Sequence, residues 1–242
     1  MAVVPFMAIA HRGASSYAPE NTFAAYDLAL QMGARHIELD VHLTTDGHVV
    51  VIHDDLLDRT TDGTGPVAAH SLAELRLLDA GSRFGAAYSG ARIPTLSEVL
   101  ACYGGRVHLH IEIKGTTPGL VPATVALVRQ YGMASSVTIT SFHLSALEET
   151  RRVAPDLPTG WLVGVVNDAI VADTLRLGLT QLCPRADLVT PALVDDLHAR
   201  GLVVRAWGVS DEQLMAAAIE AGVDGMTVNF PDVLLAALAE HS

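Results

Sequence analysis

The feature that most constrains the fold of this chain is a regular alternation between short apolar runs and amphipathic segments. The apolar runs are rich in β-branched residues, whereas the segments between them show the 3.6-residue spacing of helices. Eight such pairs in a chain of 242 residues predict a (β/α)8 TIM barrel, an α/β fold in which each parallel strand is followed by a helix. A doubly wound open sheet is the alternative, but no G-x-G-x-x-G sequence supports it.

The alternation gives the expected position of each element. The predicted strands span residues 3–10, 35–41, 106–114, 136–141, 158–163, 180–183, 202–208 and 224–228. The predicted helices span residues 21–33, 95–103, 118–131, 143–154, 168–177, 191–200, 211–221 and 231–239. A chain of this length and 50% hydrophobic content can bury one substantial core, so we expect residues 1–242 to form a single domain.

One segment interrupts the alternation. Residues 43–94 lie between the second strand and its helix and are rich in Asp, Gly, Thr and Pro, which is typical of a loop or hairpin insertion. An insertion after a barrel strand projects from the C-terminal face of the barrel, where active sites of this fold lie. We therefore expect the insertion to cover a site.

The composition limits which classes of binding partner and which cellular compartment we expect for this protein. The formal net charge of −12 disfavours nucleic acids and anionic membrane surfaces as partners, because a broad basic surface is missing. No run of eighteen apolar residues predicts a membrane-spanning helix, and residues 1–10 lack the basic start and cleavage site of a signal peptide. Cys102 and Cys183 are too few and too far apart in sequence for a disulfide framework, which favours a protein of the reducing cytoplasm.

Two carboxylates share one face of the second predicted strand. Because strand residues alternate between faces, Glu38 and Asp40 point together into the barrel while their neighbours face the helices. Two buried carboxylates repel each other and lose hydration, and a divalent cation would relieve both costs.

The third predicted strand repeats this pattern. Glu112 points inward beside Glu38 and Asp40, and three carboxylates form an oxygen-rich site suited to Mg²⁺ or Ca²⁺. Lys114 lies two residues nearer the C-terminal end, where it would meet an anion bound at the cation. A dry ion-pair cluster with Arg12 and Lys114 is the alternative, but three acids against two bases leave one negative charge, which favours a metal.

A hairpin is expected to bring a histidine to the acids. Asp46 and Gly47 form a strong hairpin signal, and the apolar run after them should pair antiparallel with the second strand. If these two residues form the whole turn, His53 lies opposite Asp40, although a bulge or a different turn would shift this register.

The first predicted strand ends at His11 and Arg12, on the same face of the barrel. Arg12 can bind an anion and His11 can transfer a proton. Glu20 could orient Arg12 or a metal-bound water, and helix capping suffices to explain Asn21. Three further inward histidines are interpreted as hydrogen-bonded core groups and not as site residues: His36, His108 and His110.

Seven motifs, in this order and at these spacings, resemble the glycerophosphodiester phosphodiesterases along nearly the entire chain. They are H-R-G with P-E-N-T at 11–22, E-L-D at 38–40, T-x-D-G with H-D-D at 44–55, E-I-K at 112–114, S-F at 141–142, W-G-V at 207–209 and N-F-P-D at 229–232.

The resemblance implies a metal-dependent enzyme that hydrolyses glycerophosphodiesters to glycerol 3-phosphate and an alcohol. It implies a divalent cation held by Glu38, Asp40 and Glu112, and His11 and His53 as general acid and base. It further implies that Arg12 and Lys114 hold the phosphate and that Trp207 lines the pocket, although core packing would otherwise explain the tryptophan.

Two other function classes remain as alternatives. Lys114 could form a Schiff base with a carbonyl substrate, but its position beside Glu112 and the acid pair suits a phosphate better. A noncatalytic metal-binding or phosphate-binding module is disfavoured because both proton-transfer histidines are present.

Overall fold

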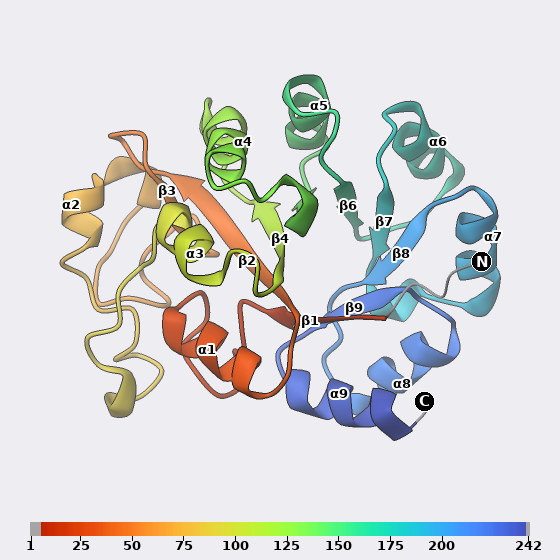
Figure 1. Ribbon diagram of the computed structural model, residues 1–242, viewed down its shortest axis with the longest axis horizontal. Helices are drawn as coiled ribbons and strands as arrows, with labels where there is room; N and C mark the ends of the chain where they lie inside the picture. Colours follow the sequence, from red (N-terminus) through yellow and green to blue (C-terminus); the bar gives the residue numbers. More distant parts are fainter. Residues whose placement is uncertain (1–5, 241–242) are drawn as a thin grey trace.

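The computed structural model, which describes residues 6–240, has a barrel of eight parallel strands at its centre with helices around the outside (Figure 1). Sequence neighbours pair around the ring, and the first strand closes it by pairing with both the second and the last. The parallel eight-stranded barrel predicted from the sequence is confirmed.

The barrel strands are β1 (Met7–His11), β2 (His36–Leu43), β4 (His108–Ile113), β5 (Val137–Ser141), β6 (Thr159–Val163), β7 (Gln181–Pro184), β8 (Val203–Ala206) and β9 (Gly225–Val228). The outer helices are α1 (Phe23–Gln31), α3 (Leu96–Tyr103), α4 (Leu120–Gln130), α5 (Leu144–Val153), α6 (Asp168–Arg176), α7 (Pro191–Ala199), α8 (Glu212–Glu220) and α9 (Pro231–Glu240). Each coincides with a predicted element to within a few residues; residues 3–5 of the first predicted strand lie outside the described part of the chain.

The two faces of the barrel strands have opposite chemistry. Outward side chains such as Ile37, Leu39 and Ile111 are fully buried in the apolar core between strands and helices. Many inward side chains are polar, including His110, Thr140, Gln181, Arg205 and Thr227, although Leu162 and Cys183 also face inward. The barrel interior is therefore more polar than the shell around it.

The hairpin after β2 differs by one residue from the predicted register. Its short second strand, β3 (Val49–Val51), pairs antiparallel so that Val41 lies opposite Val51. The turn uses three residues between Thr44 and His48, and its last residue, Gly47, has a φ of +81°. A three-residue loop that ends in a left-handed glycine adds one residue to a two-residue turn.

The expectation that His53 lies opposite Asp40 is therefore wrong. Ile52 takes that place, and its N–H donates to the carbonyl oxygen of Asp40 at 3.1 Å. His53 follows outside the ladder, and its own carbonyl oxygen lies 3.1 Å from Nε2 of His42.

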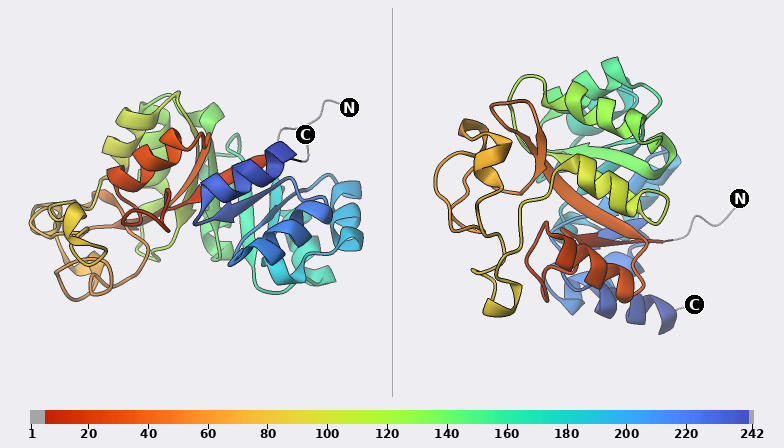
Figure 2. Two further views of the ribbon diagram at one scale, coloured as in Figure 1. Left: turned by 90° about the horizontal axis from the view of Figure 1, so that it is seen from below. Right: turned by 60° about the vertical axis from the view of Figure 1, so that its left-hand side comes forward.

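The insertion forms a small layer on one side of the barrel (Figures 1 and 2). It contains β3, the short helix α2 (Leu72–Leu75) and two single 3-10 turns at Val67–Ala69 and Ala86–Tyr88. It also has its own apolar cluster, made of Val50, Ile52, Leu57, Val67, Leu75, Ala80 and Ile93. The insertion is thus more ordered than its loop-like composition indicates.

Three histidines meet inside the barrel near the amino ends of β2 and β4. His36 Nδ1 lies 3.1 Å from His110 Nε2, and His108 Nε2 lies 2.9 Å from the hydroxyl of Thr138. Within residues 6–240, Nδ1 of His110 has no hydrogen-bond partner, so the predicted full hydrogen bonding of this group is only partly met. Burial lowers the pKa of all three, for His36 to about 4 with a further contribution from His108.

These depressed pKa values make the stability of the fold depend on pH. The unfolded chain takes up protons near pH 6.5 that the folded cluster does not accept, so the cluster's contribution to stability is complete above that pH and is lost as the pH falls toward 4. Each such proton changes the free energy of unfolding by about 1.4 kcal/mol per pH unit. In urea unfolding at pH 7 and pH 5, we expect His110→Asn to lose less stability than the wild type.

The control is His48→Asn, which removes an exposed histidine from the hairpin turn. It should follow the wild type at both pH values. An equal loss of stability in His110→Asn and the wild type would contradict the assignment to the buried cluster.

Candidate active site

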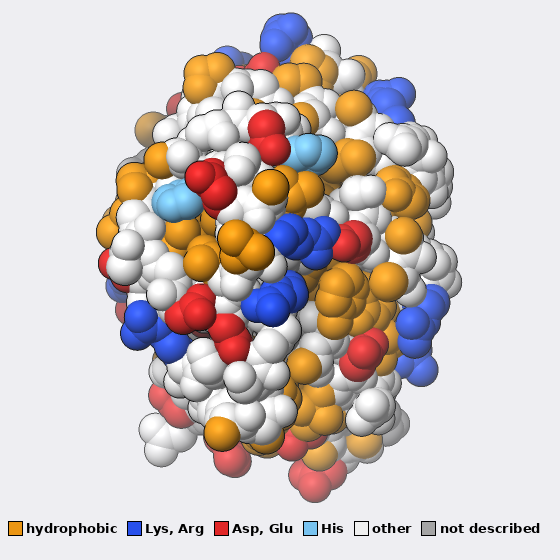
Figure 3. Space-filling view, turned by 90° about the vertical axis from the view of Figure 1, so that its left-hand side faces the viewer, with side chains coloured by type: hydrophobic (Ala, Val, Ile, Leu, Met, Phe, Trp, Pro, Cys, Tyr) orange, Lys and Arg blue, Asp and Glu red, His pale blue; other side chains and the backbone are white. Residues whose placement is uncertain are grey.

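A cavity of about 430 Å³ opens at the carboxyl ends of the barrel strands, beside the insertion. Figure 3 views the side of the molecule that carries the insertion, and basic side chains gather near its centre beside hydrophobic ones. The structure brings seven of the eight predicted site residues to the wall of this cavity, and they are His11, Arg12, Glu38, His53, Glu112, Lys114 and Trp207. The eighth, Asp40, is fully buried directly behind them.

The three predicted acids converge. Glu38, Asp40 and Glu112 are all buried, and each offers one oxygen such that the three atoms lie within 4.8 Å of one another. Asp40 and Glu112 are register partners on β2 and β4, so parallel pairing itself sets them side by side.

The chemistry of these oxygens fits a hard cation. Within residues 6–240, Oε1 of Glu38 and Oδ1 of Asp40 are buried and accept no hydrogen bond, whereas the buried Oε1 of Glu112 has Lys114 Nζ 3.2 Å away. Burial and the charges of neighbouring carboxylates raise the pKa of both Glu38 and Glu112. Mg²⁺ and Ca²⁺ prefer such oxygen ligands, and a bound cation would stabilise the ionised acids.

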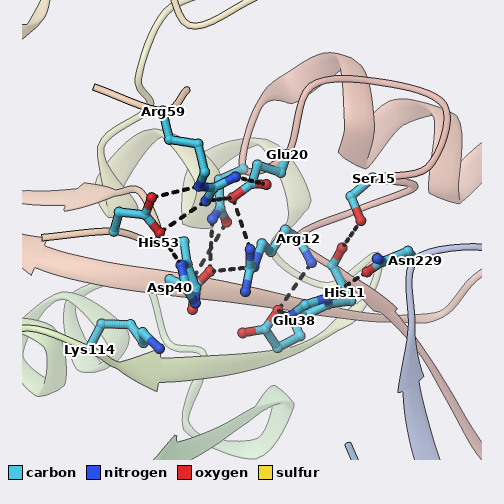
Figure 4. A network of polar contacts seen from close by, with 12 residues as sticks. His11, Arg12, Ser15, Glu20, Glu38, Asp40, His53, Arg59, Lys114 and Asn229 are labelled. Carbon is cyan, nitrogen blue, oxygen red and sulfur yellow. Dashed lines mark hydrogen bonds and ion pairs between the residues drawn. The ribbon is translucent and has the colours of Figure 1, made fainter. Parts of the chain in front are cut away.

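Two cations adjoin the acids. Arg12 Nε lies 3.1 Å from Oδ2 of Asp40, and its Nη1 donates to Oε1 of Glu20 at 3.0 Å, which confirms the expected contact with Glu20 (Figure 4). Lys114 Nζ lies 3.2 Å from Oε1 of Glu112. Both cations line the cavity, so both can reach an anion placed against the carboxylates.

The backbone at Arg12 is strained in a way that serves this arrangement. Its φ is +57°, a left-handed conformation that non-glycine residues rarely adopt. In that conformation its N–H reaches Oε2 of Glu38 at 3.1 Å. Such strain costs about 1–3 kcal/mol and is found mainly at functional sites.

His11 is held by a neutral partner. Its Nδ1 lies 2.6 Å from Oδ1 of Asn229, so this nitrogen carries the proton, and its Nε2 lies 3.9 Å from Oε2 of Glu38. Burial, together with the charge of Arg12, lowers the pKa of His11 to about 4. The imidazole is therefore neutral at pH 7, with the lone pair on Nε2.

His53 is held by a charged partner. Its Nδ1 donates to Oδ1 of Asp54 at 2.5 Å, and Asp54 in turn accepts hydrogen bonds from Arg59. These bonds, together with the contact to His53, keep the pKa of Asp54 well below its usual range. The hairpin thus delivers His53 to the cavity despite the shifted register, because the loop after β3 bends toward the barrel mouth.

Asn21 is not the helix cap that the sequence suggests. Thr22 caps α1, whereas Asn21 has a φ of +57° and its Nδ2 donates to Oδ2 of Asp40 at 2.8 Å. Its Oδ1 accepts from the hydroxyl of Tyr26. Asn21 therefore fixes one of the acids, a role that local capping preference could not reveal because its partner is nineteen positions away.

Four residues of the site were not found from the sequence. Asn229 and Asp54 are partners of the histidines and Arg59 bonds to Asp54, and only the adjacency of Asp54 to His53 offered a signal. Arg205 is the fourth: it is fully buried on β8, lines the cavity, and donates from Nη1 to the hydroxyl of Thr227 at 3.1 Å. Its inward strand position could have been predicted by alternation.

Arg205 and Glu20 both enter the charge count at the site. Glu20, which accepts from Arg12, joins the three acids of the cluster, and Arg205 joins Arg12 and Lys114, so four acids face three bases and one negative charge is left over. The same excess remains when the ion pair of Asp54 with Arg59 is included. The case for a cation therefore depends on this charge and on the buried carboxylate oxygens that accept no hydrogen bond.

An apolar wall completes the cavity. Trp207 stands edge-on to Phe142, with ring centroids 4.8 Å apart, and its Nε1 donates to the carbonyl oxygen of Val163 at 3.2 Å. Lys114 Nζ lies 5.5 Å from the centroid of the Phe142 ring. Trp207 thus lines the pocket, as the sequence resemblance implies, opposite the carboxylates.

Comparison with known proteins gives a consistent result. Residues 11–233 match the glycerophosphoryl diester phosphodiesterase family. A glycerophosphodiester phosphodiesterase of Caldanaerobacter subterraneus is 40% identical over 235 residues, which cover 95% of this chain and 96% of that protein. One from Bacillus subtilis is 34% identical and is covered over 84% of its length, against 94% of this chain.

Solved structures agree with the fold. The crystal structure of a glycerophosphodiester phosphodiesterase from Agrobacterium tumefaciens has a TM-score of 0.85 and 33% identity, covering 94% of this chain and 98% of that one. An Oleispira antarctica phosphodiesterase in complex with the product sn-glycerol-3-phosphate has a TM-score of 0.88 and 34% identity, covering 96% of both chains.

From the carboxylate cluster we predict that divalent cations stabilise the folded protein against unfolding. Because a cation binds the folded site and not the unfolded chain, Mg²⁺ or Ca²⁺ at 100 times its dissociation constant should add about 2.7 kcal/mol of stability. We expect a rise in melting temperature for the wild type in differential scanning calorimetry, and little or none for Glu112→Gln.

Glu149→Gln provides the control, because it removes a carboxylate of α5 that is remote in sequence from the cluster. It should respond to the cations as the wild type does. Equal stabilisation of Glu112→Gln and the wild type would place the bound cation elsewhere.

Proposed function

The chain belongs to the glycerophosphoryl diester phosphodiesterase family, and from this premise we propose that this enzyme hydrolyses glycerophosphodiesters to glycerol 3-phosphate and an alcohol by metal-assisted acid–base catalysis. The observation that carries the proposal is that a cluster of three buried carboxylates, two cationic side chains and two histidines converge at one cavity.

Charge determines how a diester would bind. A phosphodiester is a monoanion whose transition state carries negative charge on the nonbridging oxygens, and preorganised positive groups stabilise that charge. Arg12 and Lys114 are such groups, because Asp40 and Glu20 fix the guanidinium and Glu112 lies beside the ammonium. A cation held by the three carboxylates, Mg²⁺ or Ca²⁺, would add Lewis-acid stabilisation at the same oxygens.

His11 is suited to be the general base. Oδ1 of Asn229 accepts a hydrogen bond from its Nδ1–H, and burial keeps the ring neutral, so the Nε2 lone pair is available to take a proton. The proton would come from the nucleophile, which is either water or the neighbouring glycerol hydroxyl on a route through a cyclic phosphate. The new P–O bond forms as that proton leaves, and on the cyclic route a water must then open the ring to give glycerol 3-phosphate.

His53 is suited to be the general acid. Oδ1 of Asp54 accepts a hydrogen bond from its Nδ1–H and can stabilise the positive charge that the ring carries when Nε2 is also protonated. The Nε2 proton would pass to the alkoxide oxygen as its bond to phosphorus breaks. Two imidazoles with different partners, an amide and a carboxylate, thus divide the two proton transfers.

The domain organisation and the cellular location of the enzyme are also part of the proposed function. The barrel and its insertion would act as one catalytic domain, since the insertion supplies His53 and the barrel supplies the other residues. Among residues 6–240, none of the helices has the length and apolar character needed to cross a membrane. Both cysteines are free thiols, which is compatible with the cytoplasmic location predicted from the sequence.

The direct test is hydrolysis of a panel of glycerophosphodiesters that carry choline, ethanolamine or glycerol as the alcohol. We expect release of glycerol 3-phosphate that stops with a chelator and returns with Mg²⁺ or Ca²⁺. Full turnover in metal-free protein would overturn the role of the carboxylates, and no turnover on any diester would favour a binding module.

Removal of either histidine should abolish most turnover. We expect His11→Ala and His53→Ala each to lower kcat by about 10²–10⁴, the usual value of one positioned proton transfer, with the circular dichroism spectrum unchanged. His48→Ala, which removes an exposed histidine of the same hairpin, should keep the wild-type rate. A wild-type rate in either test variant would remove that residue from catalysis.

A further inference from the structure

Arg59 occupies an unusual place in the insertion, because one guanidinium joins two carboxylates from different parts of the fold. Its Nε and Nη2 donate to Asp54 at 2.6 and 3.0 Å, and its Nη1 and Nη2 donate to Glu20 at 2.7 and 2.8 Å. Asp54 belongs to the insertion and Glu20 to the loop between β1 and α1.

We propose that Arg59 is a positioning residue that fixes His53 against the barrel by holding Asp54. The inference deepens the proposed function, since it rests on His53 as a proton donor. The contacts form one continuous chain, in which His53 bonds to Asp54, Asp54 to Arg59, Arg59 to Glu20, and Glu20 to Arg12. Figure 4 labels the members other than Asp54. One end is a proposed catalytic group and the other is a proposed phosphate ligand.

The need for such a clamp follows from the path of the chain. His53 lies beyond the last residue of β3, so the hairpin ladder does not fix its side chain. The preceding residue, Ile52, is packed in the insertion's own apolar cluster and not in the barrel core. The position of the imidazole relative to the barrel acids therefore depends on polar contacts that cross from the insertion to the barrel.

The geometry favours a positioning role over a stabilising one. The Arg59 side chain is 47% exposed, and ion pairs at that exposure contribute little to stability because water screens them. Its planar fork makes paired bonds to both carboxylates, which fixes direction as well as distance. A lysine would keep the charge but could not span both partners with this geometry.

The experiment is a double-mutant cycle on hydrolysis of a glycerophosphodiester by the full-length protein with Mg²⁺. We expect Arg59→Ala to lower kcat about tenfold with KM changed less than threefold, because a misplaced acid slows proton transfer more than it weakens binding. Asp54→Asn should lower kcat about 10- to 100-fold. The double variant should match Asp54→Asn alone, since Arg59 acts through Asp54.

Arg76→Ala is the matched control. Arg76 is another arginine of the insertion that forms an ion pair with a barrel residue, Glu98 on α3, away from the cavity. This variant changes charge and removes a tie between insertion and barrel in the same way, and it should keep the wild-type kcat. Guanidinium ion added at millimolar concentration should restore part of the activity of Arg59→Ala and none of that of Asp54→Asn.

A spectroscopic readout separates this inference from the proposed function. The Nδ1 proton of His53, in a 2.5 Å hydrogen bond, should give a downfield proton resonance that disappears in His53→Ala and broadens in Arg59→Ala but not in Arg76→Ala. That result stands even if no diester is hydrolysed, which would defeat only the proposed function. An unchanged kcat and resonance in Arg59→Ala, or effects of Asp54→Asn and Arg59→Ala that multiply, would overturn the clamp.

Discussion

The interaction on which the site depends is the repulsion among three buried carboxylates on two adjacent parallel strands. Parallel pairing sets Asp40 beside Glu112, and strand alternation sets Glu38 on the same inner face, so the fold itself forces these charges together. Burial removes the water that would screen them, which raises the pKa of Glu38 and Glu112. An arrangement this costly persists only where other groups offset it.

Contacts with neighbouring residues offset part of the repulsion among the three carboxylates. Arg12, held in a strained left-handed backbone conformation, reaches Glu38 through its N–H and Asp40 through its side chain. Asn21, also left-handed, donates to Asp40, and Arg205 places a third positive charge in the barrel interior. These contacts leave Oε1 of Glu38 and Oδ1 of Asp40 without a hydrogen bond, so the offset is incomplete in the way that a cation site requires.

The two histidines reach the site by different routes, and this difference gives them different chemistry. His11 ends a barrel strand and is buried against a neutral amide, whereas His53 comes from the insertion and bonds to a carboxylate. The insertion has a small core of its own and therefore needs a polar connection to the barrel, which the contacts of Arg59 provide. A barrel with one inserted hairpin can thus present two imidazoles with unlike hydrogen-bond partners, an amide and a carboxylate, to one cavity.

The sequence alone determined the barrel, the inward direction of Glu38, Asp40 and Glu112, and the place of Lys114, because strand alternation and parallel register are local and periodic. Predictions from the sequence were wrong where the length of a turn or a contact between distant residues determines the position of a side chain. Gly47 shifted the hairpin register by one, and Asn21 bonds to Asp40 instead of capping a helix. Only the tertiary structure decided the partners of the histidines, since Asn229 lies 218 positions from His11 and no periodic pattern connects them.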